Sequence, residues 1–304
     1  MRRFAIALAA STIMTTSAMA QSIGVSMSYF DDVFLTTLRE TMAARAKALG
    51  AAIQFEDGQG DISRQIAHLQ NFIAAKVDVM MINPVDTAST PKMTKLATDA
   101  GIPLVYFSRA PQDQTLPEGV YYVGADENMS GKLQGEEIAR LLDYKGKVVI
   151  MMGELGDNAT RLRTEGVEKV VAEHPDMEIV EKQTATFQRN EAMDLMNNWL
   201  VSGVEMDAIA ANNDEMAIGA IMALRQAGLD PAALVIAGID ATQDALFEMK
   251  RGNLDVTVFQ DAKGIGEGAV DTAVKAAKGD EVDSFMWIPF KLVTQDNYQE
   301  LVSQ

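Results

Sequence analysis

The stretch IGVSMSYFDDVFLTTLRETMAARAKALGAAIQF, residues 23–55, decides the fold class. It begins with the short apolar run Ile23 to Met27, continues with a segment of helical periodicity from Phe34 to Leu49, and ends with a second apolar run. Gly50 follows the helical segment, at a position where helices commonly end. A strand, a helix and a second strand in this order predict a βαβ unit and therefore a parallel sheet.

The same alternation continues along the chain and then starts again. The first series predicts further strands at 77–82, 102–107 and 120–123 and helices at 62–75 and 89–100. The second series, from a helix near Asp126, predicts strands at 148–152, 178–183, 208–211, 234–239 and 256–259, a helix at 264–277 and a strand-like segment at 285–293. We therefore expect an α/β fold of two doubly wound, Rossmann-like lobes.

Residues 1–20 have the features of a secretory signal peptide. Arg2 and Arg3 precede an apolar run, and Ala18-Met19-Ala20 forms a small-x-small cleavage pattern before Gln21. The apolar run is shorter than the roughly 20 residues that span a bilayer, although an uncleaved anchor is the alternative. The chain has no Cys, which excludes acylation of Cys and disulfides. We expect cleavage after residue 20 and a periplasmic protein.

Composition and missing motifs argue against several classes of function. The formal net charge of −17 would repel nucleic-acid backbones and anionic lipids. The sequence contains no phosphate-binding loop and no G-x-S-x-G elbow, and its two His residues, His68 and His174, lie far apart. We expect a binding protein without cofactor or metal, not an enzyme. A hydrolase with two catalytic carboxylates is the enzymatic alternative.

Polar and aromatic residues follow nearly every predicted strand, where ligands bind in open α/β sheets. Carboxylate, amide and guanidinium groups match the vicinal hydroxyls of a sugar or cyclitol, and flat apolar side chains match its C–H faces. Phe34 and Phe187 could supply such faces from opposite lobes. The alternative for each polar residue is a helix cap or a turn, and for each Phe it is the core.

The sequence resembles the ribose-binding group of periplasmic sugar-binding proteins, whose fold LacI-type repressors share. The match is most specific at NDEMAIGA, residues 213–220, followed by Gly238-Ile239-Asp240 and Gln260. INPVD at 82–86, VGADEN at 123–128 and RLRTEG at 161–166 add to it. A repressor would need a helix-turn-helix before the first strand, and here the predicted signal peptide stands there.

The resemblance implies a type I periplasmic binding protein, in which a three-segment hinge closes two lobes over a small sugar or cyclitol. Together with the breaks in the strand series, it implies chain crossings near 124–126, 259–261 and 288–291. The N-terminal lobe would then comprise residues 21–125 and 261–288, and the C-terminal lobe residues 126–260 and 289–304. The expected partner is the inner-membrane permease of an ABC importer, with a chemoreceptor or sensor as the alternative, and we expect a monomer.

By the same resemblance, the ligand contacts fall on Asp32, Phe34, Leu35, Ser108, Arg109, Arg163, Phe187, Asn213, Asp240 and Gln260. The two arginines are expected to donate forked hydrogen bonds to ring hydroxyls and the two aspartates to accept them. The two amides could do either.

Three positions depart from the ribose pattern. Asp32 stands where ribose binders carry Asn, Leu35 replaces an aromatic residue, and Ser108 replaces an Asp. The expected ligand is therefore myo-inositol or a related cyclitol of the inositol or rhizopine type, with a pentose or hexose as the alternative. Asp32 would accept from two adjacent hydroxyls or face an ammonium group, unless it only caps the following helix.

Overall fold

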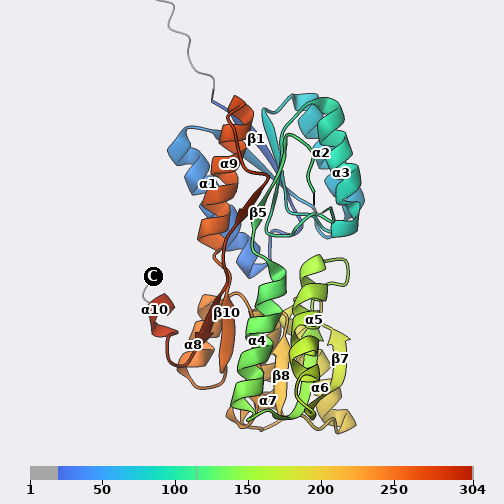
Figure 1. Ribbon diagram of the computed structural model, residues 1–304, viewed down its shortest axis with the longest axis vertical. Helices are drawn as coiled ribbons and strands as arrows, with labels where there is room; N and C mark the ends of the chain where they lie inside the picture. The colour runs from blue at the N-terminus through green and yellow to red at the C-terminus, as the bar shows by residue number, and fades with distance from the viewer. Residues whose placement is uncertain (1–19, 114, 303–304) are drawn as a thin grey trace, which may run out of the picture.

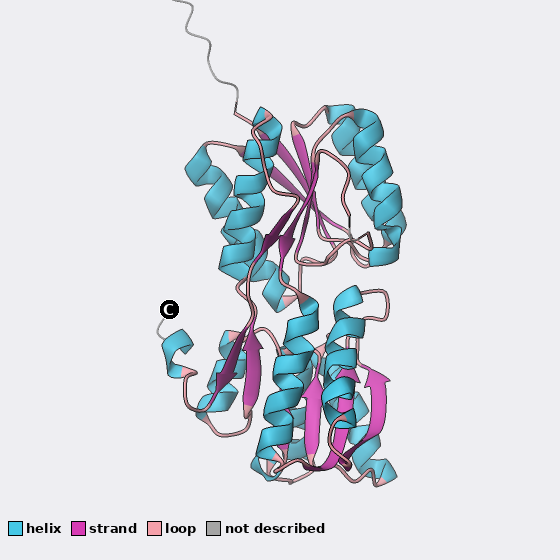
Figure 2. Cartoon of the chain, viewed as in Figure 1, coloured by secondary structure: helices cyan, strands magenta, loops and turns pink. Residues whose placement is uncertain are grey.

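Two six-stranded sheets, one in each lobe, organise the chain (Figures 1 and 2). The computed structural model describes residues 20–113 and 115–302, so that the predicted signal peptide lies outside the described residues except for Ala20. The predicted fold class, two doubly wound α/β lobes, is confirmed.

The sheet of the first lobe is entirely parallel. In spatial order its strands are β11 (Phe285–Trp287), β5 (Val120–Gly124), β4 (Leu104–Phe107), β3 (Val79–Ile82), β1 (Ser22–Met27) and β2 (Ala52–Asp57). Because β1 lies between β2 and β3, the direction of winding reverses beside β1. In open α/β sheets a crevice for ligands forms at this reversal, beyond the carboxyl ends of the strands.

Helices cover both faces of this sheet (Figure 1). They are α1 (Val33–Leu49) and α9 (Ala262–Lys278) on one face, and α2 (Ile62–Ala75), the 3₁₀ turn η1 (Thr87–Ser89) and α3 (Thr90–Ala100) on the other. Leu38 and Met42, one turn apart on α1, are fully buried against the sheet. On α9, a Cβ at Gly266 would press against Thr41 of α1, so glycine permits the close packing of these helices.

The second lobe repeats the topology. In spatial order its strands are β12 (Lys291–Thr294), β10 (Val256–Phe259), β9 (Val235–Ala237), β8 (Ala208–Ala211), β6 (Lys145–Met152) and β7 (Asp176–Thr184). All pairs are parallel except β10 with β12. Its helical elements are α4 (Glu127–Leu141), α5 (Asn158–Ala172), α6 (Arg189–Ser202), α7 (Asp214–Gln226), η2 (Pro231–Ala233), α8 (Gln243–Lys250) and α10 (Gln299–Val302).

Three short segments connect the lobes: β5 to α4, β10 to α9, and β11 to β12 (Figure 1). The prediction of a single strand-like segment at 285–293 is wrong, because this part of the chain forms two strands that belong to different sheets. Pro289 lies between them, where the missing N–H removes a donor from any ladder.

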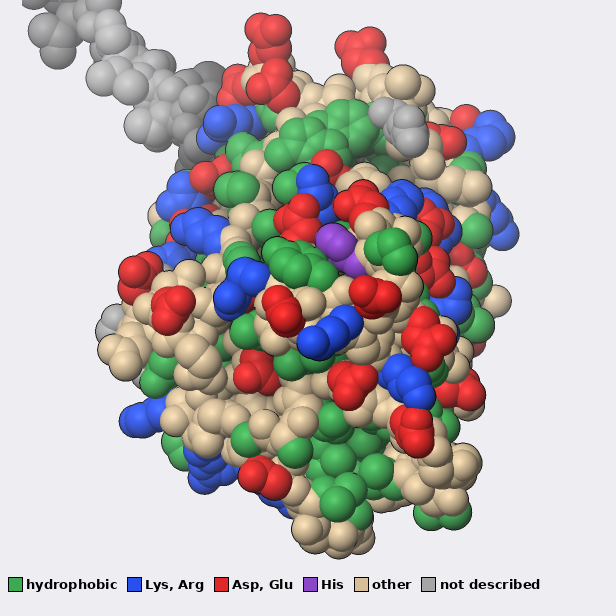
Figure 3. All heavy atoms as spheres, turned by 60° about the horizontal axis from the view of Figure 1, so that its bottom comes forward, with side chains coloured by type: hydrophobic (Ala, Val, Ile, Leu, Met, Phe, Trp, Pro, Cys, Tyr) green, Lys and Arg blue, Asp and Glu red, His purple; other side chains and the backbone are tan. Residues whose placement is uncertain are grey.

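The surface in Figure 3 carries acidic and basic side chains interspersed, so the excess of acidic residues does not form one continuous field on this face. Within residues 20–113 and 115–302, no helix has the length and apolar character needed to cross a membrane.

Candidate functional site

The ten predicted ligand contacts all line one cavity between the lobes. Asp32, Phe34, Leu35, Ser108 and Arg109 come from the first lobe, and Arg163, Phe187, Asn213, Asp240 and Gln260 follow in the second lobe and at its connection to α9. The cavity is small, with a volume of about 50 Å³.

Asp32 has two roles in the structure. Its Oδ1 accepts a hydrogen bond of 2.7 Å from the backbone N–H of Leu35, which caps α1. The residue also lines the cavity, and burial raises its pKa although the Leu35 N–H and Arg109 act in the opposite direction. A carboxylate has two oxygens, so capping the helix leaves Oδ2 for a ligand.

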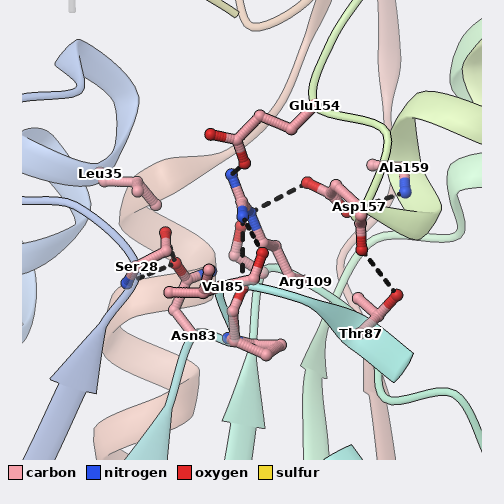
Figure 4. Close-up of polar contacts among 12 residues, drawn as sticks. Ser28, Leu35, Asn83, Val85, Thr87, Arg109, Glu154, Asp157 and Ala159 are labelled. Atoms are coloured by element: carbon pink, nitrogen blue, oxygen red, sulfur yellow. Dashed lines mark hydrogen bonds and ion pairs between the residues drawn. The ribbon is translucent and has the colours of Figure 1, made fainter. Parts of the chain in front are cut away.

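Arg109 follows β4, and its guanidinium faces protein groups on several sides (Figure 4). Nε and Nη2 form ion pairs of 2.9 Å each with Asp157 and Glu154. Nη1 donates to the carbonyl oxygens of Pro84 and Val85 at 3.2 and 3.1 Å. Burial alone would lower the pKa of Arg109, but the neighbouring carboxylates raise it, so this cation stays charged.

Arg163, on α5, is held by Glu127 in the first turn of α4. Nε donates to Glu127 Oε2 at 2.8 Å and Nη2 donates to Oε1 at 3.1 Å. Nη1 donates to the Asn212 carbonyl at 2.7 Å, and Nη2 also reaches Gln260 Oε1 at 3.2 Å. Burial works against the charge, whereas Glu127 raises the pKa of Arg163.

These contacts correct one prediction. We expected Arg109 and Arg163 to donate forked hydrogen bonds to a ligand, but in both residues the Nε–Nη2 edge faces protein carboxylates. A guanidinium has five N–H donors in fixed directions. Each arginine can therefore offer a ligand single N–H groups and positive charge, but no fork.

Asp240 and Gln260 keep hydrogen-bonding capacity at the cavity. The nearest cation to Asp240 is Arg163, whose Nη1 lies 3.9 Å from Oδ1. Burial raises the pKa of Asp240 well above its usual value, against the effect of Arg163. Gln260 accepts from Arg163 through Oε1, and among the described residues its Nε2 has no acceptor. An acceptor and a donor are thus available side by side.

The backbone is strained at three of the lining residues. Ser108, Phe187 and Asp240 have φ values of 61°, 63° and 123°, in a region that side chains other than glycine rarely adopt. Such strain persists only where the surroundings enforce it, and it concentrates at ligand sites. Phe187 is also part of the core beside α6 and α7, and Phe34 packs against the core of the other lobe. Both the core and the ligand interpretation of these rings therefore remain compatible with their positions.

Three further residues that line the cavity, Glu127, Asp157 and Ala159, were not among the ten predicted ligand contacts. A signal was present, because Asp157 follows the predicted strand at 148–152 and Glu127 begins the helix after the strand at 120–123. Assigning these two carboxylates to the site required knowing which arginines they pair with. Across the described part of the chain, no group of three potential metal ligands is suitably placed to hold an ion.

Comparison with known proteins agrees with this geometry. Residues 23–281 match the family described as periplasmic binding protein domain. The chain belongs to this family. A relative from Rhizobium meliloti that carries the name of a rhizopine-binding protein is 51% identical over 304 residues, which cover 99% of this chain and 98% of the relative.

Two solved structures similar to this chain contain an inositol. A solute-binding protein of an ABC transporter from Bacillus halodurans, with bound myo-inositol, has a TM-score of 0.90 and 44% identity and covers 95% of this chain and 99% of its own. The myo-inositol binding protein of Caulobacter, also with myo-inositol, has a TM-score of 0.88 and 27% identity, with coverage of 93% and 97%. The predicted family and the predicted role in sugar-type solute binding are confirmed.

Proposed function

We propose that this periplasmic binding protein captures myo-inositol or a related cyclitol by closing its lobes, and delivers it to an ABC permease. One observation carries the proposal: Asp32 of the first lobe lines the same cavity as Asp240 and Gln260. Their free oxygens and N–H groups match a ring that carries a hydroxyl on every carbon. The relatives that bind rhizopine by name or hold myo-inositol support the same ligand class.

The finer assignments are part of this proposal. The lobe limits at 21–125 with 261–288 and at 126–260 with 289–304 are supported by β11 and β12, which join different sheets. Cleavage after Ala20 would release the protein into the periplasm as a monomer. The permease is the proposed partner, and docking to a chemoreceptor is the alternative. The cavity residues would act only in binding, without turnover.

Thermal unfolding of residues 21–304 with a panel of polyols tests the proposal. The panel comprises myo-inositol, scyllo-inositol, ribose, xylose, galactose and glucose. A ligand at 100 times its dissociation constant adds about 2.7 kcal/mol to the free energy of unfolding, which raises the melting temperature measurably. We expect the largest rise with an inositol. A rise with a pentose or hexose alone would refute the cyclitol assignment, and hydrolysis of a glycoside would refute the binding role.

A further inference from the structure

A group of polar contacts joins the two lobes beside the cavity (Figure 4). Arg109 belongs to the first lobe, while Glu154 and Asp157 belong to the loop between β6 and α5 of the second. The ion pairs from Nη2 to Glu154 and from Nε to Asp157, both 2.9 Å long, therefore cross the cleft.

The same loop makes two further contacts across the cleft. The backbone N–H and the hydroxyl of Thr87 both donate to the carbonyl oxygen of Gly156, at 3.1 and 3.2 Å. The carboxylate of Glu154 also interacts with the Tyr29 hydroxyl, and burial together with this interaction raises the pKa of Tyr29 to about 12. Glu154, Gly156 and Asp157 thus all contact the first lobe.

Glu154 differs from the other charged residues that join the lobes. Arg109 and Asp157 line the cavity, but Glu154 does not. Any effect of its carboxylate on a bound ligand must therefore act through Arg109 or through the relative position of the lobes.

We propose that Glu154 is a latch that favours the closed form before ligand arrives and positions Arg109 beside the cavity. The side chains of Arg109 and Glu154 are only 10% and 17% exposed, so water competes little with their attraction in the closed form. Opening would separate the two charges and the Thr87–Gly156 contacts. Water would then solvate the separated groups, which limits the free energy gained on closure. The gain is not abolished where the paired charges also form hydrogen bonds.

The latch has a consequence for affinity. When only the closed form holds the ligand, the apparent dissociation constant equals the intrinsic constant divided by the closed fraction. Weakening the latch should therefore weaken binding mainly through faster release, because the ligand enters the open form and leaves after opening.

The test compares Glu154→Gln with the wild type, first without ligand. Small-angle X-ray scattering should show a larger radius of gyration for Glu154→Gln, and Tyr29→Phe should change it in the same direction by less. Glu205→Gln is the matched control, since it neutralises a carboxylate that pairs with Lys147 away from the cavity. Its scattering should equal that of the wild type. All variants should unfold within a few degrees of the wild type.

The second arm uses myo-inositol and therefore rests on the proposed function. Stopped-flow measurement should give about tenfold faster release from Glu154→Gln and an almost unchanged association rate. Unchanged scattering of the unliganded variant would overturn the latch, whether or not affinity falls. If no panel polyol binds to the wild type, the proposed function fails, while the scattering comparison still decides the latch.

Discussion

Several lining residues combine two tasks at the scale of the single side chain. Asp32, Asp157 and Asn213 each accept a hydrogen bond from the first turn of a helix, and each also lines the cavity. Helix caps and ligand contacts were alternatives on sequence grounds because both need the same residue types after a strand. In the structure the same three residues cap helices and line the cavity. The second oxygen of Asp157 pairs with Arg109, and the Asn213 amide N–H donates to the Phe187 carbonyl oxygen.

Asp32→Asn separates the two tasks. Asn is as good an N-cap as Asp, so the melting temperature without ligand should stay within a few degrees of the wild type. The affinity for an inositol should fall about 10- to 100-fold, because a hydrogen bond to a charged acceptor contributes about 1.5–3 kcal/mol. Titration calorimetry measures the change. A lower melting temperature with unchanged affinity would assign Asp32 to capping alone.

Asp214 lies behind the cavity and should make stability depend on pH. It is fully buried, accepts from the Thr257 hydroxyl and the Thr242 N–H, and has a pKa raised to about 7 by burial. The folded state binds the Asp214 proton more tightly than the unfolded state does, so protonated Asp214 contributes to the free energy of unfolding. This contribution is full below about pH 4 and is lost as the pH rises to 7.

The melting temperatures of the wild type and Asp214→Asn at pH 5 and pH 8 test this prediction. Burial lowers the pKa of His68, which works in the opposite direction, so the informative quantity is the difference between the two proteins. The wild type should lose more stability than Asp214→Asn between pH 5 and pH 8. Equal losses would show that Asp214 is ionised throughout this range.

At the scale of elements, the position of Arg163 depends on how closely α4 and α5 approach. A Cβ at Gly166 of α5 would lie 2.7 Å from the backbone of Lys132, and one at Gly131 of α4 would overlap the carbonyl of Arg163. Neither backbone can move without moving the helix that carries Arg163 or its partner Glu127.

Gly166→Ala should therefore destabilise the protein and weaken ligand binding together. Overpacking of this kind costs about 1–3 kcal/mol, measured as a lower midpoint of urea unfolding. Gly135→Ala at the same interface is the comparator, because its nearest neighbours would lie at 3.1 and 3.2 Å. The loss of stability in Gly135→Ala should be offset in part, by about 1 kcal/mol, because Ala has a higher helix propensity than Gly. Equal effects of the two substitutions would contradict this account.

The sequence predicted most elements because their signals are local. α2 begins and ends at the predicted residues 62 and 75, and β8 and β10 match their apolar runs. The segment 285–293 was misassigned because an apolar run does not encode which sheet it joins. The pairing of Glu127 with Arg163 was missed for a similar reason, since the two residues meet only when α4 packs on α5.

At the scale of the whole molecule, function depends on two lobes that share one topology and face each other with the carboxyl ends of their strands. The sequence predicted the ten cavity residues through a family resemblance, but not the contacts between lobes. Arg109 was expected to serve the ligand with a fork, and the structure pairs it with Glu154 and Asp157 instead. Contacts across a cleft leave no periodic signal in the chain.

The central claim, that the closed cavity holds one cyclitol, is tested most directly by isothermal titration of residues 21–304 with myo-inositol. The account predicts saturable binding of one molecule per chain, with a dissociation constant in the micromolar range or below. Most of that affinity should be lost in Asp240→Asn, in which an amide replaces the acidic side chain opposite Asp32. Absence of binding heat with myo-inositol and scyllo-inositol at millimolar concentration, or unchanged affinity in Asp240→Asn, would contradict it.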